Sequence, residues 1–385
     1  MSTRFAIVQR SNALVAEDLP LPELTKSQVL VKIANSSLNP TDVQSFDGHA
    51  FGDGAVLGCD FVGVVEKVGS GVTRYKIGDK IAALIWGGKI EGLGAYSYMF
   101  LAYCTSVLIL VATSTYCVAE EAVSFKVPSG LDFASASTVP LAGNTAWLAL
   151  FSKDSLNIPK INSSETSLLV WGGSCKSSID IPSSTVGAYT IQIAKKHGFN
   201  VVTTCSPHNF DVVKKHGATY VFDYNDPKVV ENIAKVVPDL AYGFDCIGNS
   251  TSSTLSGQAM GSKEGSVICT VRPGKADTEN VPSNVKVTDV LVFTAFLKPH
   301  VYKKVYKWDV IVPDLPIDLA THPEDHALSK EMYEKIPEWI QDGSLVPQKP
   351  RDMGKLTVDS LKEAMELNRQ GKVSNEELCF QVASF

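Results

Sequence analysis

Two neighbouring stretches decide the fold of this chain: LLVWGGS at residues 168–174 and TVGAYTIQIAKK at residues 185–196. The first has the composition of a buried strand that ends in a glycine turn, and the second has the pattern of a helix starting at Gly187. A dinucleotide-binding βαβ unit begins in this way, because glycines let backbone amides approach a pyrophosphate and a helix N-terminus offers unpaired N–H groups. Many such joints hold glycines for packing alone, so further support is needed. A second strand, NVVTTC at residues 200–205, ends in a small polar loop and supplies it.

The composition indicates a cytoplasmic enzyme of two domains. A chain of 385 residues exceeds one ordinary core, and 44% hydrophobic with 20% charged residues is ordinary for a soluble protein. The net charge of −6, without a basic run, argues against a nucleic-acid partner. The N-terminus lacks a signal-peptide pattern, and the apolar segment 106–112 is too short to span a membrane. The eight cysteines are scattered, as expected for reduced core residues.

The pattern of elements changes near residue 165. Before it, short strands separated by glycine turns (29–34, 63–69 and 76–84) predict a small barrel. After it, strands alternate with helices, which predicts a parallel, doubly wound sheet. The expected strands are 167–171, 200–205, 219–222, 241–246 and 266–271, and the expected helices are 186–197, 208–216, 227–236 and 250–261. Helical patterns return at 326–341 and 358–370, and a last strand at 377–382 is expected to return to the first domain.

Several ordered motifs carry a family resemblance that covers nearly the whole chain. They are NPTD at 39–42, LGCDFVG at 57–63, GDKI at 78–81 and GKVS at 371–374. With the barrel first and the doubly wound domain second, the chain resembles the medium-chain dehydrogenase/reductase superfamily. The resemblance implies an α/β protein with a GroES-like β-barrel catalytic domain (residues 1–163, with 311–385 returning to it) and a Rossmann domain that binds NADPH (164–310). TCSPHN at 204–209 with Asp223 and Tyr224 resembles fungal trans-acting enoyl reductases of polyketide biosynthesis.

The residues at the zinc positions of this superfamily indicate that no metal is bound. A catalytic zinc needs thiolate and imidazole ligands and an open tetrahedral position. Here no cysteine precedes Asp42, no His-Glu pair follows Gly58, and the closely spaced four-cysteine lobe is missing. Cys59 alone is more typical of a small core residue than of a ligand. Without a Lewis acid, alcohol oxidation loses its usual route, whereas reduction of a conjugated C=C needs only a hydride and hydrogen bonds to the enolate.

The loop after the second strand of the Rossmann unit favours NADPH. Enzymes that use NAD usually place Asp or Glu there, which binds the ribose 2′-OH and repels a 2′-phosphate. This chain has Ser206, Pro207, His208 and Asn209 instead. Their donors suit a phosphate, although the same residues also fit a plain helix start with Ser206 as N-cap and Pro207 at the first position. Tyr224 matches a tyrosine that packs on the adenosine phosphate in related quinone and enoyl reductases.

The remaining site residues follow from the resemblance alone. Thr145 is the candidate catalytic hydrogen-bond donor, and a helix-capping threonine is the alternative. The implied cofactor-binding residues, besides the loop and tyrosine above, are Thr41, Asp42, Val43, Gln44, Ser184, Thr185, Val186, Gly187, Val271, Arg272, Val373 and Ser374. The implied substrate-binding residues are Thr138, Val139, Pro140, Leu141, Ala142, Gly143, Asn144, Thr145, Leu291, Val292, Phe293, Thr294 and Ala295.

The chain departs from the family pattern in three places. Relatives often have a lysine where this chain has Gln44. Residues 175–183 interrupt the glycine turn, either as a loop that bulges outward or as one that spoils the pyrophosphate cradle. Residues 101–117 separate two family-like stretches, and they are either a hairpin or a translated intron in the gene model, which we favour.

The sequence therefore predicts a zinc-free, NADPH-dependent enoyl reductase that acts on an α,β-unsaturated thioester carried by a polyketide synthase. Two rivals remain: a quinone or enal reductase of free small molecules, and a degenerate NADPH-binding protein used as a scaffold. We expect a monomer, because Pro299 follows an edge segment near 288–296 and hinders pairing of strands between subunits.

Overall fold

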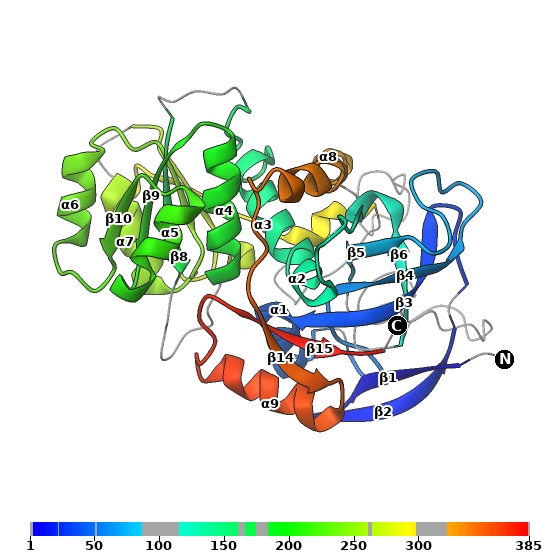
Figure 1. The fold of residues 1–385 in the computed structure, drawn as a ribbon. Helices are drawn as coiled ribbons and strands as arrows, with labels where there is room; N and C mark the ends of the chain where they lie inside the picture. Colours follow the sequence, from blue (N-terminus) through cyan, green and yellow to red (C-terminus); the bar gives the residue numbers. More distant parts are fainter. Residues whose placement is uncertain are drawn as a thin grey trace, which may run out of the picture.

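The computed structural model describes residues 3–21, 23–50, 52–86, 115–160, 166–174, 184–260, 264–297 and 322–383. Two lobes lie side by side, each built on its own sheet (Figure 1). Helix α3 (Pro140–Phe151) lies where the lobes meet, and it contacts α4 of one lobe and β4 and β5 of the other. One hydrophobic core runs through both lobes, with Val62 on one side, Val170 on the other and Trp147 of α3 between them. The shared core fixes the lobes around whatever site lies between them.

The first lobe is a six-stranded parallel sheet flanked by helices, as the alternation of strands and helices predicted. Its order is β10-β9-β8-β11-β12-β13. The strands are β8 (Ser167–Ser174), β9 (Asn200–Cys205), β10 (Tyr220–Asp223), β11 (Tyr242–Asp245), β12 (Val267–Thr270) and β13 (Lys286–Asp289). The helices are α4 (Ser184–Lys196), α5 (Phe210–His216), α6 (Val229–Val236) and α7 (Ser250–Met260). Successive strands are added to one side of β8 as far as β10 and then to its other side from β11 to β13, so the strand order reverses between β8 and β11. Ligands of such sheets bind beyond the carboxyl ends of the strands at that point.

The second lobe holds a seven-stranded sheet in which the last strand has returned to the first part of the chain, as predicted. The order is β14-β15-β3-β4-β5-β7, and β6 pairs with β3. The bounds are β3 (Gln28–Leu38), β4 (Asp60–Val68), β5 (Lys80–Leu84), β6 (Tyr116–Glu120), β7 (Ser124–Lys126), β14 (Pro350–Lys355) and β15 (Glu377–Gln381). A separate antiparallel pair is formed by β1 (Thr3–Arg10) and β2 (Ala13–Pro20).

Four further α-helices in the described residues complete this lobe: α1 (Pro40–Asp47), α2 (Phe133–Ser137), α8 (Pro323–Gln341) and α9 (Val358–Arg369). Local sequence accounts for two of their starts. Helix α1 begins with Pro at its first position, and the backbone N–H of Asn39 donates to Asp42 Oδ2 at 2.8 Å. In α9, the hydroxyl of Thr357 accepts from the N–H of Ser360 at 3.0 Å, which satisfies one of the orphan donors of a helix start.

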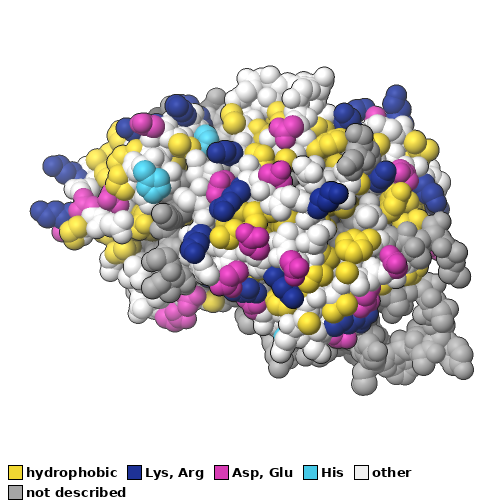
Figure 2. Space-filling view, turned by 60° about the horizontal axis from the view of Figure 1, so that its bottom comes forward, with side chains coloured by type: hydrophobic (Ala, Val, Ile, Leu, Met, Phe, Trp, Pro, Cys, Tyr) yellow, Lys and Arg dark blue, Asp and Glu magenta, His cyan; other side chains and the backbone are white. Residues whose placement is uncertain are grey.

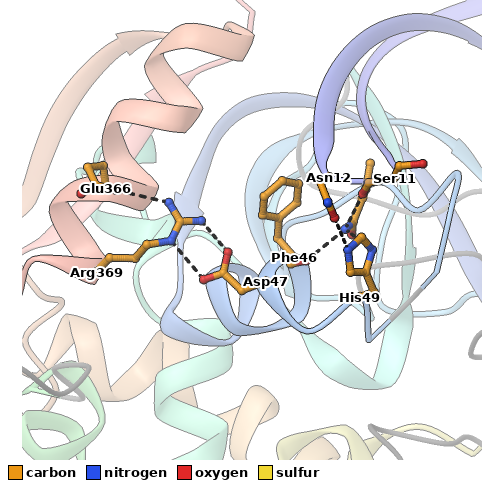
Figure 3. Close-up of polar contacts among 8 residues, drawn as sticks. Ser11, Asn12, Phe46, Asp47, His49, Glu366 and Arg369 are labelled. Atoms are coloured by element: carbon orange, nitrogen blue, oxygen red, sulfur yellow. Dashed lines mark hydrogen bonds and ion pairs between the residues drawn. The ribbon is translucent and has the colours of Figure 1, made fainter.

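Helices α1 and α9 are tied together at the surface. The guanidinium of Arg369 donates twice to the carboxylate of Asp47, at 2.6 and 3.0 Å (Figure 3). In the same view, His49 follows α1 and its Nε2 lies 2.5 Å from the side-chain oxygen of Asn12 in the turn between β1 and β2. On the face drawn in Figure 2, acidic and basic side chains are interspersed over the molecule, and neither sign forms a continuous region.

Three expectations about local structure are corrected. Helix α4 starts at Ser184, not at Gly187, which lies within its first turn. The edge segment expected near 288–296 is shorter: β13 ends at Asp289, and residues 292–295 form a 3-10 helix, while Pro299 lies outside the described residues. The expected insertion at 101–117 ends too late, because Tyr116 and Cys117 belong to β6 and pair with β3. Residues 101–114 lie outside the described residues. Residues 175–183 also lie outside them.

Candidate functional site

A cavity lies between the lobes at the carboxyl ends of the parallel strands. The loops that follow β11, β12 and β13 contribute to its lining, together with residues of β3, α1, α3, α4 and α9 and of β15 with the segment before it. The lining residues are Leu38, Asn39, Pro40, Thr41, Gln44, Leu141, Ala142, Thr145, Thr185, Val186, Ile247, Val271, Arg272, Pro273, Val290, Leu291, Val292, Phe293, Asn368, Val373, Glu376, Glu377 and Leu378.

The joint between β8 and α4 brings two backbone segments unusually close. A Cβ on Gly187 would lie 2.5 Å from the carbonyl oxygen of Gly172 and 2.9 Å from Cα of Gly173. Gly172 itself has φ +86°, and a Cβ there would lie 2.6 Å from the side chain of Ile247. Only glycine fits these positions, so the N-terminus of α4 is held directly against the end of the strand. Thr185 and Val186 of that first turn line the cavity.

Asp245 holds the loop that follows β11. Its buried carboxylate accepts from the backbone N–H groups of Ile247 and Gly248, both at 3.0 Å, and from the hydroxyls of Ser252 and Ser253 at 2.8 and 2.7 Å. Burial raises the pKa of Asp245, and these four donors lower it. The loop is therefore fixed with Ile247 facing the cavity.

Arg272 is the one cation among the described residues that line the cavity. Its Nε donates to the carbonyl oxygen of Gly248 at 2.7 Å, which ties the loop after β12 to the loop after β11. No carboxylate of the described residues forms an ion pair with it. The guanidinium and the N-terminus of α4 together make this end of the cavity attractive to an anion.

Two buried carboxylates, Asp42 and Asp60, lie next to residues of the cavity lining. Asp60 at the start of β4 accepts from the N–H of Leu141 at 2.7 Å and from Nδ2 of Asn39 at 3.0 Å. Burial raises the pKa of Asp42 to about 6. Burial also raises the pKa of Asp60 well above its ordinary value, and the nearby Asp42 raises it further, although the two hydrogen bonds oppose this. These contacts fix Asn39 and the start of α3 relative to one another.

Thr145 lines the cavity but is not a helix cap, so that alternative is excluded. It lies inside α3, which begins at Pro140, and its hydroxyl donates to the carbonyl oxygen of Leu141 at 2.8 Å. The hydroxyl oxygen can accept a hydrogen bond from a ligand as it stands. To donate to a substrate carbonyl, Thr145 would have to give up its bond to Leu141.

An apolar wall closes the side of the cavity formed by the segment after β13. Leu291, Val292 and Phe293 line it, and all three are buried. The ring of Phe293 lies 4.0 Å from that of Trp86, centroid to centroid, so a second aromatic side chain supports it from behind. Such a wall suits an acyl chain better than a charged group.

The residues expected to select NADPH lie together at the end of β9, outside the cavity lining. Ser206 is the N-cap residue of a 3-10 helix (Pro207–Asn209), yet its side chain makes no capping bond. Its hydroxyl donates instead to the hydroxyl of Tyr224 at 3.3 Å. Ser206 and Asn209 are buried, whereas Pro207 and His208 are exposed.

None of the remaining predicted residues is among the described residues that line the cavity. Eight of them are buried: Asp42, Val43, Thr138, Val139, Gly143, Asn144, Thr294 and Ala295. Gly187 packs on β8, and the carbonyl oxygen of Pro140 accepts a hydrogen bond from the hydroxyl of Tyr333. The hydroxyl of Ser374 has no hydrogen-bond partner. For Ser184, the structure describes only the backbone. The sequence reasoning missed ten lining residues, namely Leu38, Asn39, Pro40, Ile247, Pro273, Val290, Asn368, Glu376, Glu377 and Leu378. One signal could have found Glu377: it is an acid that opens an otherwise apolar strand, ELCF at 377–380.

Comparisons with known proteins place this architecture in a family. Residues 25–129 match the alcohol dehydrogenase GroES-like domain, and residues 185–308 match the zinc-binding dehydrogenase family. A zinc-type alcohol dehydrogenase-like protein of Schizosaccharomyces pombe is 31% identical over 351 residues, which cover 88% of each chain. The chain belongs to the medium-chain dehydrogenase/reductase superfamily and is an oxidoreductase of that superfamily, whose members bind a nicotinamide cofactor.

Within the superfamily, the chain is similar to fungal enoyl reductases. A trans-enoyl reductase of Alternaria alternata is 28% identical over 99% of both chains. The enoyl reductase component of the lovastatin nonaketide synthase of Aspergillus terreus is 28% identical, over 98% of this chain and 95% of that one. An alcohol dehydrogenase from Rhizobium etli, described as zinc-dependent, has the same fold, with a TM-score of 0.72 at 20% identity and full coverage of both chains.

Three further observations concern metal, membrane and cysteines. In the described ranges, no three His, Cys, Asp or Glu side chains form a group that could hold a metal ion. No helix in the same ranges has the length and apolar character needed to cross a membrane. The six cysteines that the structure describes are buried thiols outside any disulfide, Cys59 among them, as expected for reduced core cysteines.

Proposed function

We propose that this protein is an NADPH-dependent enoyl reductase that reduces the α,β-double bond of an acyl thioester carried by a polyketide synthase. The observation that carries the proposal is the cavity between the lobes, which combines an anion-attracting end with a buried apolar wall. Leu291, Val292 and Phe293 form that wall, and Thr185 and Arg272 belong to the same lining. The names of the fungal relatives favour the same reaction and a synthase as partner.

The residues at the joint between β8 and α4 fit a dinucleotide. The contact between Gly187 and Gly172 leaves no room for a side chain and holds the N-terminus of α4 against the end of β8, and a helix N-terminus offers its N–H groups to a pyrophosphate. Arg272 adds a positive charge to the same cavity. We infer that Thr185, Val186 and Arg272 hold the pyrophosphate half of the cofactor, and that Thr41, Gln44 and Val373 line its nicotinamide half.

The end of β9 supports NADPH over NADH. No carboxylate follows the strand directly, and Ser206 and Tyr224 present paired hydroxyls there, with His208 exposed beside them. A 2′-phosphate would meet hydrogen-bond donors at this point, whereas an NAD-specific enzyme places an acid there.

In the proposed reaction, the reduced nicotinamide supplies a hydride to the β-carbon of the enoyl thioester. The residues of this chain orient the two partners and keep water away from the reacting carbon. The buried apolar wall holds the acyl chain, and the polar groups of Thr41, Gln44 and Thr145 are within the same lining, where they can contact the thioester carbonyl or the nicotinamide. Enolate formation requires only such hydrogen bonds, so the reaction does not depend on a metal.

The proposal is tested by following NADPH consumption by the pure protein with a crotonyl-type thioester, 1,4-benzoquinone and a simple enal. We expect turnover with the thioester, faster than with either free small molecule, and slower turnover with NADH. Turnover with quinone or enal but not with thioester would replace the proposal by a small-molecule reductase. NADPH binding without turnover on any of the three would indicate a binding protein without activity.

A further inference from the structure

Glu377 is the most unusual side chain of the cavity. It opens β15, lines the cavity and is 4% exposed. Neither oxygen of its carboxyl group has a hydrogen-bond partner. A buried ionised carboxylate without partners is strongly disfavoured, so such a group keeps its proton.

The surroundings of Glu377 favour the protonated form as well. The groups that act on it electrostatically are Asp60 at the start of β4 and Asp42 of α1, both buried carboxyls. The other titratable groups coupled to it are the hydroxyl of Tyr189 on α4 and the thiol of Cys379 on β15, whose pKa values are both raised. No lysine, arginine or histidine of the described chain pairs with Glu377. Burial first, and then these two acids, raise the pKa of Glu377 well above its ordinary value.

The other ionisable residues of the cavity cannot deliver a proton. Arg272 remains charged at any pH at which the protein is folded. Glu376 is already engaged in an ion pair with Arg351 at 3.2 Å. No lysine, histidine, tyrosine or cysteine is found among the described lining residues, and the hydroxyls of threonines are very weak acids.

We propose that Glu377 is the acid that protonates the α-carbon after hydride transfer. This inference rests on the proposed function. The hydride from the reduced nicotinamide forms the new C–H bond at the β-carbon, and the π-electrons of the double bond move to the thioester oxygen as an enolate. The enolate then takes the carboxyl proton of Glu377: the O–H bond breaks, a C–H bond forms at the α-carbon, and Glu377 is left as a carboxylate. Solvent returns the proton when the product leaves.

The first test measures the protonation state of the Glu377 carboxyl group in the absence of substrate turnover. Infrared difference spectra of wild type minus Glu377→Gln at neutral pH should show the carbonyl stretch of a protonated carboxyl group. Glu376→Gln is the matched control, because it removes the neighbouring acid of the same strand start; its difference spectrum should show a carboxylate. A carboxylate signal for Glu377 at neutral pH would overturn the inference.

The second test follows the reaction with a crotonyl-type thioester and NADPH. We expect Glu377→Gln to lower the rate by about 100-fold or more, the usual contribution of a general acid, with NADPH affinity unchanged, and Glu377→Asp to restore part of the rate. In wild type, the rate should fall with rising pH as Glu377 loses its proton. This decrease in the pH–rate profile should be absent in Glu377→Gln and present in Glu376→Gln.

In D2O, wild type should place deuterium on one face of the α-carbon, and Glu377→Gln should lose that selectivity. An unchanged pH–rate profile and unchanged selectivity in Glu377→Gln would refute the role of Glu377 while leaving the proposed function intact. If wild type does not reduce the thioester at all, the proposed function fails and the inference fails with it, and the infrared result then reports only the state of the carboxyl group.

Discussion

The glycine joint between β8 and α4 can be tested with two alanine substitutions in helices. In Gly187→Ala, the new Cβ would lie 2.5 Å from the carbonyl oxygen of Gly172, a backbone atom that cannot move aside cheaply. Overpacking of this kind costs about 1–3 kcal/mol, and the gain in helix propensity returns about 0.5–1 kcal/mol. We therefore expect a net loss of about 1–2 kcal/mol in the free energy of unfolding, together with weaker NADPH binding.

Gly143→Ala provides the matched control in α3. There the nearest atom to the new Cβ is Cγ1 of Val139 at 3.6 Å, an ordinary van der Waals contact. Only the helix propensity should change, which stabilises the protein by about 0.5–1 kcal/mol. Urea unfolding followed by tryptophan fluorescence suits the comparison, because Trp171 and Trp147 are buried beside the two sites. If Gly187→Ala is as stable as wild type, or if both variants shift in the same direction, the packing argument is wrong.

Three further predictions concern charge. Because burial raises the pKa of Asp42 from 3.8 to about 6, its contribution to stability is fully present below pH 3.8 and is lost as the pH rises through 6. The free energy of unfolding of Asp42→Asn should therefore rise by up to about 3 kcal/mol relative to that of wild type across this pH range, measured by urea unfolding at each pH. A difference between the two proteins that does not change with pH would contradict the prediction. Arg369→Ala breaks the exposed double hydrogen bond to Asp47, so the loss in unfolding free energy should stay below about 1 kcal/mol and shrink in high salt. Ser206→Asp places an acid at the end of β9 and should reverse the preference for NADPH over NADH in fluorescence titrations; a preference that persists would show that other residues read the 2′-phosphate.

The sequence predicted the parallel sheet well because its signals are local. Buried runs such as residues 168–171 alternate with amphipathic helices, and the right-handed crossover leaves few other arrangements for them. The return of β15 to the sheet that holds β3, β4 and β5 was also predicted. Residues 291–295 were placed at the cavity by resemblance alone, since an apolar run does not distinguish a strand from the 3-10 helix that the structure shows.

The cavity was less predictable, because it is assembled from segments far apart in the chain. Asn368 on α9 and Glu377 on β15 meet Asn39 and Gln44 there, and no local pattern connects these positions. The state of Glu377 depends first on its burial and then on Asp60 and Asp42, and all three arise only in the folded protein. A single sequence reports the acid but not its neighbours, so its unusual chemistry becomes visible only in three dimensions.

The place of β15 has a consequence for synthesis of the chain. β3 carries two partners along one of its edges: β6 pairs with residues 28–32, and β15 pairs with residues 35–38. While the protein is being translated, the whole doubly wound lobe emerges before residues 377–381 exist. Until then, the half of β3 next to α1 offers unpaired backbone groups to any other nascent chain. The doubly wound lobe can fold as it emerges, whereas the other lobe must wait for β15, and the cavity between them is completed last.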